Sequence, residues 1–215
     1  MDELPAITPI NFFQIAFSCS YLPVKEAFPR LSLSTSKKHL LPNTAALCNE
    51  KPFAQGAMGW NEEGLEFCFS VNKGLEEVFF PNITKGDSIE LFIDTRNIKT
   101  SGFNTRFCHH FFFLPEAIEG RQAGEMTHFR TEDAHELCEG SELFVKTIVK
   151  KNEYTLHCHI PKQCLIGFDP QQFDRLGFTY RINRPHLESQ HFCVVTADYR
   201  LEEQPSLWSQ LRLIK

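Results

Sequence analysis

The sequence lacks a long hydrophobic run. A membrane-spanning helix needs about 18 or more consecutive apolar residues, and no stretch of this chain approaches that length. The segment 10–17 is apolar but short, and Asn11 and Gln14 interrupt it after an acidic start. A secretory signal instead begins with positive charge and continues through about 7–15 apolar residues. We therefore expect no membrane partner and a cytoplasmic location.

The sequence also lacks the charge pattern of a nucleic-acid-binding protein. Its 22 Lys and Arg residues are outnumbered by 27 Asp and Glu residues, which gives a formal net charge of -5. The short basic pairs Lys37-Lys38 and Lys150-Lys151 are typical of solvated turns. Because nonspecific binding to nucleic acid depends on cations that neutralise phosphates, we expect no nucleic-acid partner.

The common catalytic and cofactor motifs are absent as well. The sequence contains no CxxC, GxSxG, HExxH, GxxxxGK or GxGxxG pattern. Glu90 and Asp94 share one face of a predicted strand, but they stand two pleats apart, which is too far for a retaining glycosidase pair. A dyad of Cys108 and His110 lacks a third group that would orient the base. We therefore expect a non-catalytic protein without a cofactor.

Cysteine is plentiful, but its spacing matches no familiar site. Eight cysteines would suit four disulfides in a secreted protein. Because no export signal is evident, we expect mostly free thiols and a thiol count close to eight. Most of these residues lie in apolar or strand-like contexts and are expected to be small core residues: Cys19, Cys48, Cys68, Cys138, Cys158, Cys164 and Cys193.

The sequence has little sustained helical periodicity. Apolar and polar residues instead alternate with a period of two, which is typical of strands. The 21 phenylalanines suit pleated, half-buried surfaces. Within 88–94, Ile89, Leu91 and Ile93 are predicted to face the core, so Glu90 and its alternates face outward. The predicted strands are 12–18, 54–60, 65–71, 88–94, 106–114, 143–149, 154–160, 176–182, 191–197 and 211–214. One short helix is predicted within 161–174.

Many short strands separated by turns predict an all-β fold, a two-sheet antiparallel β-sandwich of the jelly-roll or immunoglobulin-like kind. Asn61-Glu62-Glu63-Gly64 is predicted to be the turn of a hairpin. The segment 1–52 is predicted to hold an N-terminal strand and then an extended segment or long loop. No repeat or linker divides the chain, so we expect residues 1–215 to form one domain.

Four segments in a fixed order resemble a known family. They are 60–65 (WNEEGL), 86–94 (GDSIELFID), 176–183 (LGFTYRIN) and the closing 205–215. GDSIELFID is the most specific of them. Together they are similar to carbohydrate-binding module family 9 and its sugar-binding-like relatives, and the similarity covers about 53–215.

The resemblance implies a β-sandwich that carries a sugar on a shallow face, clamped by two tryptophans. The ligand-contacting glutamate of the family matches Glu90. The two tryptophans would fall near Thr84 and Ala197, and neither position is aromatic. Since aromatic stacking contributes about 0.5–1.5 kcal/mol per pair beyond buried area, we expect simple sugars to bind weakly.

The strand after Glu90 carries the other candidate ligand residues. Alternation places Phe107, His109, Phe111 and Phe113 toward the core, where His109 is expected to have a hydrogen-bond partner. The opposite, ligand-facing set is Arg106, Cys108, His110 and Phe112. Arg106 or His110 is expected to meet Glu90 and form a charged, hydrogen-bonded patch.

Three functions stay open. The first is a non-catalytic module for a carbohydrate or glycoconjugate, with an altered ligand face. The second is a structural domain that docks a protein partner. The third is a metal-binding protein that uses Cys108, His110, His157 and His159, whose i, i+2 spacing places each pair on one strand face. We expect this four-residue site not to assemble, because nothing requires the two strands to pair, and any bound metal to be substoichiometric.

Overall fold

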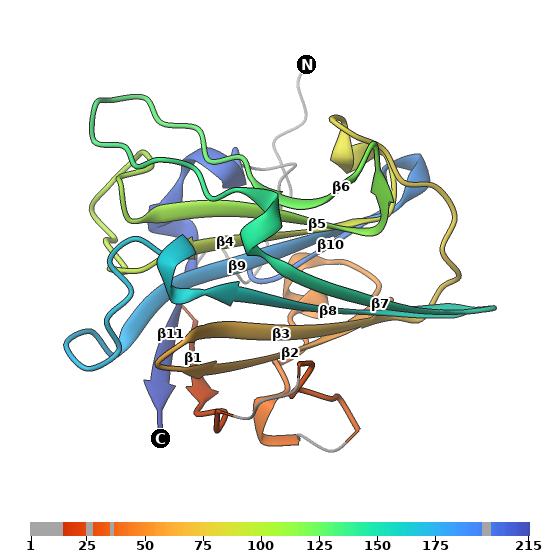
Figure 1. The fold of residues 1–215 in the computed structure, drawn as a ribbon, viewed down its shortest axis with the longest axis horizontal. Coiled ribbons are helices and arrows are strands. Elements are labelled where there is room, and N and C mark those ends of the chain that lie inside the picture. Colours follow the sequence, from red (N-terminus) through yellow and green to blue (C-terminus); the bar gives the residue numbers. More distant parts are fainter. Residues whose placement is uncertain (1–14, 25–27, 35–36, 195–198) are drawn as a thin grey trace.

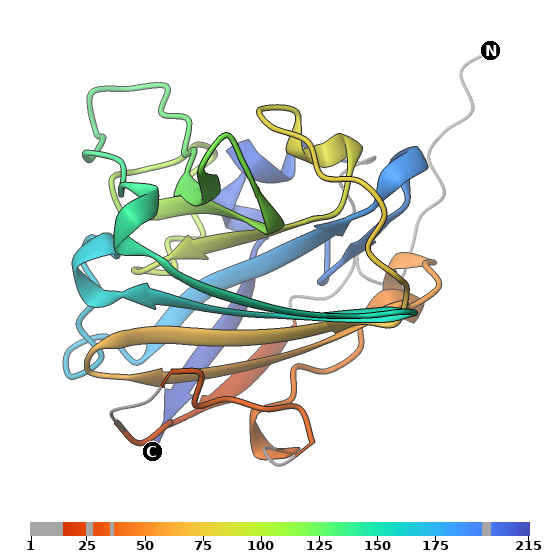
Figure 2. The same ribbon diagram turned by 45° about the vertical axis from the view of Figure 1, so that its right-hand side comes forward.

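A computed structural model of the chain describes residues 15–24, 28–34, 37–194 and 199–215. Its strands form two packed sheets, which Figures 1 and 2 show as an upper and a lower layer. The bounds are β1 (Ala16–Ser20), β2 (Ala54–Asn61), β3 (Gly64–Val71), β4 (Ser88–Asp94), β5 (Cys108–Ile118), β6 (Arg121–Glu125), β7 (Phe144–Lys150), β8 (Glu153–Pro161), β9 (Arg175–Asn183), β10 (Ser189–His191) and β11 (Ser209–Ile214).

The first sheet has seven strands, in the order β1-β11-β9-β4-β5-β6, with β10 also paired to β9. The second has four strands, in the order β2-β3-β8-β7. Pairing is antiparallel except between β1 and β11, which run parallel. The predicted β-sandwich is confirmed, with this one parallel pair as a departure.

Helical structure in the described residues is confined to short 3-10 turns. They are η2 (Lys37–His39), η3 (Ala45–Cys48), η4 (Ile83–Lys85), η5 (Gly140–Glu142), η6 (Lys162–Cys164), η7 (Pro185–Leu187), η8 (Leu201–Glu203) and η9 (Pro205–Leu207). The short helix predicted within 161–174 corresponds to η6. No helix of the described residues has the length and apolar character needed to cross a membrane.

Aromatic rings fill the space between the sheets. Phe67 and Phe69 of β3 contact Phe178 and Tyr180 of β9, with ring centroids 5.8 Å apart for Phe67–Phe178 and 5.2 Å for Phe69–Tyr180. All four side chains are buried. This pairing explains why phenylalanine is abundant, since large rings supply much apolar area to a sandwich core.

The β2–β3 hairpin is built as the sequence predicts. Ala54 pairs with Val71 and Asn61 with Gly64, and the Asn61 side-chain oxygen accepts the backbone N–H of Glu63 at 2.9 Å. Gly64 has φ +141°, and a Cβ there would lie 2.2 Å from the Ile160 carbonyl oxygen. Only glycine fits this combination of backbone angle and close approach.

Two sequence expectations need correction. The strand expected over 191–197 is wrong for residues 192–194: β10 ends at His191, because Cys193 adopts a left-handed φ of 67° and turns the chain. Residues 195–197 of this expected strand lie outside the described residues. The expectation that the cysteines are mostly free is confirmed, but the expected count close to eight is too high by two. Cys138 and Cys164 form a disulfide across 26 residues, while the other six cysteines are free and buried.

Candidate functional site

Two irregular segments cover the outer face of the seven-stranded sheet and leave a hollow between them. On one side, Leu201 and Trp208 pack on Phe92 and Cys108. On the other side, η4 and its neighbours pack on Phe112. The volume of the hollow is about 300 Å³, at the small end of small-molecule sites. Its lining residues are Pro81, Asn82, Ile83, Thr84, Glu90, His110, Met126, His128, Arg181, Glu202 and Glu203.

Glu90 lies between the two covers, and its carboxylate is held by three side chains. Arg181 of β9, directly opposite in the ladder, donates from Nε to Oε1 at 2.7 Å and from Nη2 to Oε2 at 2.9 Å. His110 of β5 lies 2.8 Å from Oε2 through Nε2, and Asn183 donates to Oε1 at 2.6 Å. Since a carboxylate can only accept, His110 Nε2 must carry the proton of this bond.

This environment keeps Glu90 ionised. Burial by itself raises the pKa of the carboxyl, but the hydrogen bonds and charges of His110 and Arg181 outweigh burial and hold the pKa well below its usual 4.5. The same pairing raises the pKa of Arg181, against the opposing effect of its own burial. The Arg181–Glu90 pair is therefore a buried bidentate salt bridge, which fixes both side chains in one geometry.

The acidic wall of the hollow contains an acceptor without a partner. Glu202 Oε2 is a buried atom that receives no hydrogen bond from any described residue. Its neighbour Glu203 pairs with Arg130 and is therefore occupied. A buried acceptor that is left unpaired costs about 1–3 kcal/mol, so the fold carries this cost at a residue that lines the hollow.

A wider hollow of about 750 Å³ adjoins the first. The two share Pro81 and Met126, and the wider one extends over β6 toward the disulfide. Phe80 and Phe112 line it, with their ring centroids 5.6 Å apart. The small hollow on the outer face therefore neighbours a larger one with aromatic lining, which also reaches the core residues Ala123 and Leu143 at the edge of the sandwich.

The predicted direction of the side chains on β4 is confirmed, but their exposure is not. Ile89, Leu91 and Ile93 lie in the core between the sheets, and Glu90 points to the outer face. Glu90 is nevertheless only 1% exposed, because the covering segments exclude solvent. Asp94 is also buried, and its carboxylate accepts the backbone N–H groups of Arg96 and Ile98 at 2.9 and 2.5 Å.

The predicted ligand-facing set divides into three groups. His110 meets Glu90, as expected. Cys108 and Phe112 share its face, but each lies under a cover: Cys108 beneath Trp208, and Phe112 beside Ile83. Burial raises the pKa of the Cys108 thiol to about 12. Arg106 precedes β5, is exposed and pairs with Asp133, so of the two residues expected as alternatives to meet Glu90, only His110 does.

Sequence reasoning missed Arg181 and Asn183, although both lie in the LGFTYRIN segment that carries the resemblance. The signal available was parity: Arg181 and Asn183 alternate with the core residues Tyr180 and Ile182. What the sequence could not supply is the strand order. Only the pairing of β9 with β4 brings these side chains onto Glu90.

Thr84 and Ala197 are the positions expected to match the two tryptophans of the sugar clamp. Thr84 is exposed in η4 and borders the hollow, so no aromatic ring stands there. Ala197 lies outside the described residues. Among the residues that line the small hollow, the only rings besides Pro81 are the imidazoles of His110 and His128.

The four-residue Cys/His site is not formed. Cys108 and His110 lie on the outer face of the seven-stranded sheet. His157 and His159 belong to β8 of the other sheet and alternate with its core residues Leu156, Cys158 and Ile160. The two pairs thus lie on opposite outer faces of the sandwich. Burial lowers the pKa of His157 and of His159.

Comparison with known proteins gives structural matches only. No protein-family model and no curated protein matches the sequence. Two solved structures of a carbohydrate binding module family 9 from Caldicellulosiruptor kristjanssonii are similar in fold. The complex with cellotriose has a TM-score of 0.61 at 13% sequence identity, and the alignment covers 93% of each chain. The complex with glucose has a TM-score of 0.64 at 12% identity, and covers 93% of this chain and 96% of that one.

These matches define the class of the fold: a β-sandwich like that of carbohydrate-binding module family 9, extending over nearly the whole chain. The resemblance read from four short segments is therefore confirmed at the level of structure. At such low identity the matches say nothing about the ligand of this chain.

Proposed function

We propose that this protein is a non-catalytic binding module for a hydroxyl-rich ligand, a carbohydrate or glycoconjugate, which occupies the hollow over Glu90. The observation that carries the proposal is the buried network of Glu90, His110, Arg181 and Asn183 beneath an open hollow. Glu90 is also the residue to which the family resemblance gives the ligand contact.

The chemistry of the lining suits hydroxyl groups. Glu202 offers an unpaired acceptor, while Arg181 and His110 reach the hollow as polar edges held in place by Glu90. Hydroxyls both donate and accept, so they can satisfy either kind of group. The similar structures from Caldicellulosiruptor kristjanssonii hold cellotriose and glucose, which supports a sugar as the first ligand to test.

The adjoining hollow favours a ligand longer than one sugar ring. Its Phe80 and Phe112 rings supply aromatic surface, whereas the only aromatic rings that line the small hollow are the imidazoles of His110 and His128. We therefore infer that oligosaccharides or glycoconjugates bind better than monosaccharides. The absence of an aromatic side chain at Thr84 keeps the affinity for simple sugars in the millimolar range.

Calorimetric titration with glucose, cellobiose and cellotriose tests this proposal. We expect weak binding that strengthens with length. Glu202→Gln should lower the affinity by about 2–10-fold, the equivalent of about one hydrogen bond. Glu136→Gln is the matched control, because Glu136 is exposed and borders neither hollow. Equal loss in both variants would count against the hollow, and so would unchanged binding in Glu202→Gln.

We also propose that the module acts without catalysis. The cytoplasm is the location that we propose to test, although the Cys138–Cys164 disulfide is typical of an oxidising compartment. Glu90 is locked in a salt bridge and Asp94 in backbone hydrogen bonds, so neither carboxylate is available as an acid or base. Incubation with oligosaccharides should release no reducing ends. Fractionation of cells that express the full chain should recover the protein in the cytosol, and recovery from the medium would refute this location.

A second candidate, a protein-interaction domain, has one observation in its favour. β7 ends the strand order of the four-stranded sheet, and it exposes Phe144, Ile148 and Val149 by 53%, 43% and 52%. Exposed apolar edge strands pair readily with other chains. Self-association that disappears in Ile148→Lys would support this function. If the protein stays monomeric at high concentration, the partner of β7 must be a different protein.

A further inference from the structure

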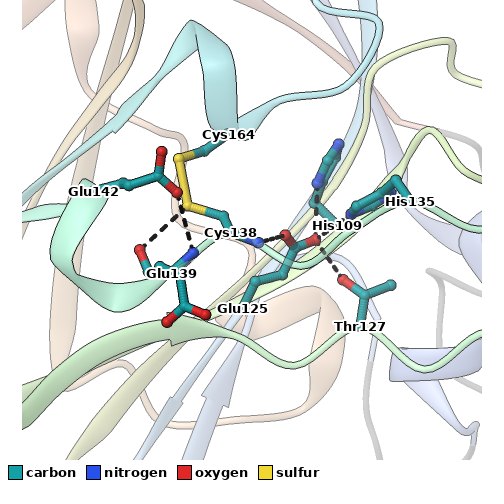
Figure 3. Close-up of a disulfide and its surroundings, with 8 residues drawn as sticks. All are labelled: His109, Glu125, Thr127, His135, Cys138, Glu139, Glu142 and Cys164. Carbon is teal, nitrogen blue, oxygen red and sulfur yellow. Dashed lines mark hydrogen bonds and ion pairs between the residues drawn. A yellow bond between two sulfur atoms is a disulfide. The ribbon is translucent and has the colours of Figure 1, made fainter.

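A second polar cluster lies at the other side of β5, away from the hollow. Figure 3 shows His109 of β5 and His135 of the following loop directed at the carboxylate of Glu125 of β6. His109 Nδ1 and His135 Nε2 each lie 2.8 Å from the same oxygen, Glu125 Oε1. The three side chains are 0%, 5% and 1% exposed for His109, His135 and Glu125 respectively. None of them lines the small hollow over Glu90, and Glu125 alone borders the wider one.

Four hydrogen bonds converge on the Glu125 carboxylate, and three of them meet the same oxygen. Besides the two imidazoles, the Thr127 hydroxyl donates to Oε1 at 2.7 Å. Oε2, in contrast, receives only the backbone N–H of Cys138, at 2.9 Å, among the bonds to described residues. One oxygen with two lone pairs thus faces three polar groups. A cation that takes the place of imidazole protons would relieve this crowding.

The orientation of the His135 ring also suits a metal ligand. Its Nδ1 lies 2.7 Å from the backbone carbonyl oxygen of Arg106. A carbonyl and a carboxylate can only accept, so in the metal-free protein Nδ1 and Nε2 each carry a proton, and a metal ion at Nε2 would take the place of the proton there. A ring nitrogen that donates to a backbone carbonyl while the other faces a ligand position is the usual arrangement of a metal-bound histidine, and His135 has it. His109 does not, because its Nε2 is buried and makes no hydrogen bond to a described residue.

We propose that His109 Nδ1, His135 Nε2 and Glu125 Oε1 form a binding site for a zinc-class divalent metal ion. The three ligand atoms lie within 4.8 Å of one another. Two imidazoles and one carboxylate suit Zn²⁺ or Co²⁺, whereas Ca²⁺ and Mg²⁺ need more oxygen ligands. Metal bonds of about 2.0 Å at tetrahedral angles require nitrogen–oxygen separations of about 3.3 Å, so each imidazole would have to move by about half an ångström.

The surroundings complete the site. The Thr127 hydroxyl or a water molecule takes the fourth position. Glu125 also borders the wider hollow, which gives an ion a path to the cluster. The ion would join β5 and β6 to the loop that carries His135, close to the Cys138–Cys164 disulfide (Figure 3).

The test is metal binding by the full chain after dialysis against a chelator. Competition titration with Zn²⁺ should show one equivalent bound per chain. His135→Asn removes a ligand, so the affinity for Zn²⁺ should fall by more than about 100-fold. That loss is larger than the one expected when a residue that only orients a metal ligand is removed. His186→Asn is the matched control, because His186 is exposed on η7 and should leave the affinity unchanged.

Cobalt substitution identifies the ligands independently. Co²⁺ should give tetrahedral visible bands in the wild-type protein without a thiolate charge-transfer band, which separates this site from one built on reduced Cys138 and Cys164. If His135→Asn fails to fold, nitrogen NMR of the wild-type protein decides, since Zn²⁺ should shift the signals of His109 and His135. Uptake below about one tenth of an equivalent would overturn the proposal. Equal weakening by His186→Asn, or a thiolate band, would overturn it too.

Discussion

At the scale of the residue, the outer face is organised around Glu90. Four hydrogen bonds from three side chains converge on its two oxygens, and two of them come from Arg181. The sequence predicted the direction of Glu90 and its contact with His110, because parity along a strand is local. It could not predict Arg181, because that contact depends on which strands pair. The same burial means that Glu90 cannot be removed without a cost in stability.

Glu90→Gln is expected to destabilise the fold. The substitution leaves the Arg181 guanidinium buried without a counter-charge, and such a loss costs about 3–5 kcal/mol. Urea unfolding compared with Glu136→Gln, an exposed position, measures the difference. A loss below about 1 kcal/mol would mean that the pair is solvated and behaves like a surface salt bridge.

The pH dependence of stability follows from the lowered pKa of Glu90. A carboxyl whose pKa falls on folding contributes stability that is fully present above its unfolded value, near 4.5, and is lost as the pH falls toward the folded value. The difference in unfolding free energy between wild type and Glu90→Gln should therefore be constant at neutral pH and shrink below about pH 4.5. A difference that grows on acidification would contradict the assigned charge state.

Thr84→Trp should create the platform that the hollow lacks. Thr84 is exposed at the rim, so an indole there can cover a sugar ring without disturbing the core. Stacking of about 0.5–1.5 kcal/mol would raise the affinity for glucose or cellobiose by about 2–10-fold. Calorimetry with Thr84→Leu as the control separates stacking from general hydrophobicity. Equal gains in both variants would show that the ring itself contributes nothing.

At the scale of the element, regular strands were predictable and irregular segments were not. β4 begins and ends as expected, because Ile89, Leu91 and Ile93 alternate strictly with the residues of the outer face. The segment 20–50 contains η2 and η3 and no strand of its own among the described residues, since its prolines and serines carry no period. The loop before β7 is fixed by the Cys138–Cys164 disulfide, which no local spacing pattern revealed.

The disulfide gives an element-scale prediction. Thiol titration of the denatured, unreduced protein should count six free cysteines, and reduction should raise the count to eight. Closure of a 26-residue separation stabilises a fold by about 3 kcal/mol in the chain-entropy description. Cys138→Ala combined with Cys164→Ala should lose about that much. Eight free thiols before reduction would show that the pair is reduced in the native protein.

At the scale of the whole molecule, both sheets share one aromatic core, while irregular segments cover the outer faces. The fold class could be predicted from alternation and turns, and the structural matches confirm it. The hollow could not be predicted, because it exists only where the cover around η4 and the cover around η8 and η9 fail to meet. The proposed ligand-binding role thus depends on the tertiary packing of segments without a sequence signature.

The most direct test of the binding role is an NMR titration of the isotope-labelled chain with glucose and cellotriose. We expect saturable shifts of the amide signals of Thr84, His110, Met126, His128 and Glu202, stronger with cellotriose, and unchanged signals along β7. Such a pattern would place the sugar in the hollow over Glu90. No saturable shifts with either sugar, or shifts confined to the outer face of the four-stranded sheet, would contradict a carbohydrate-binding role for this face.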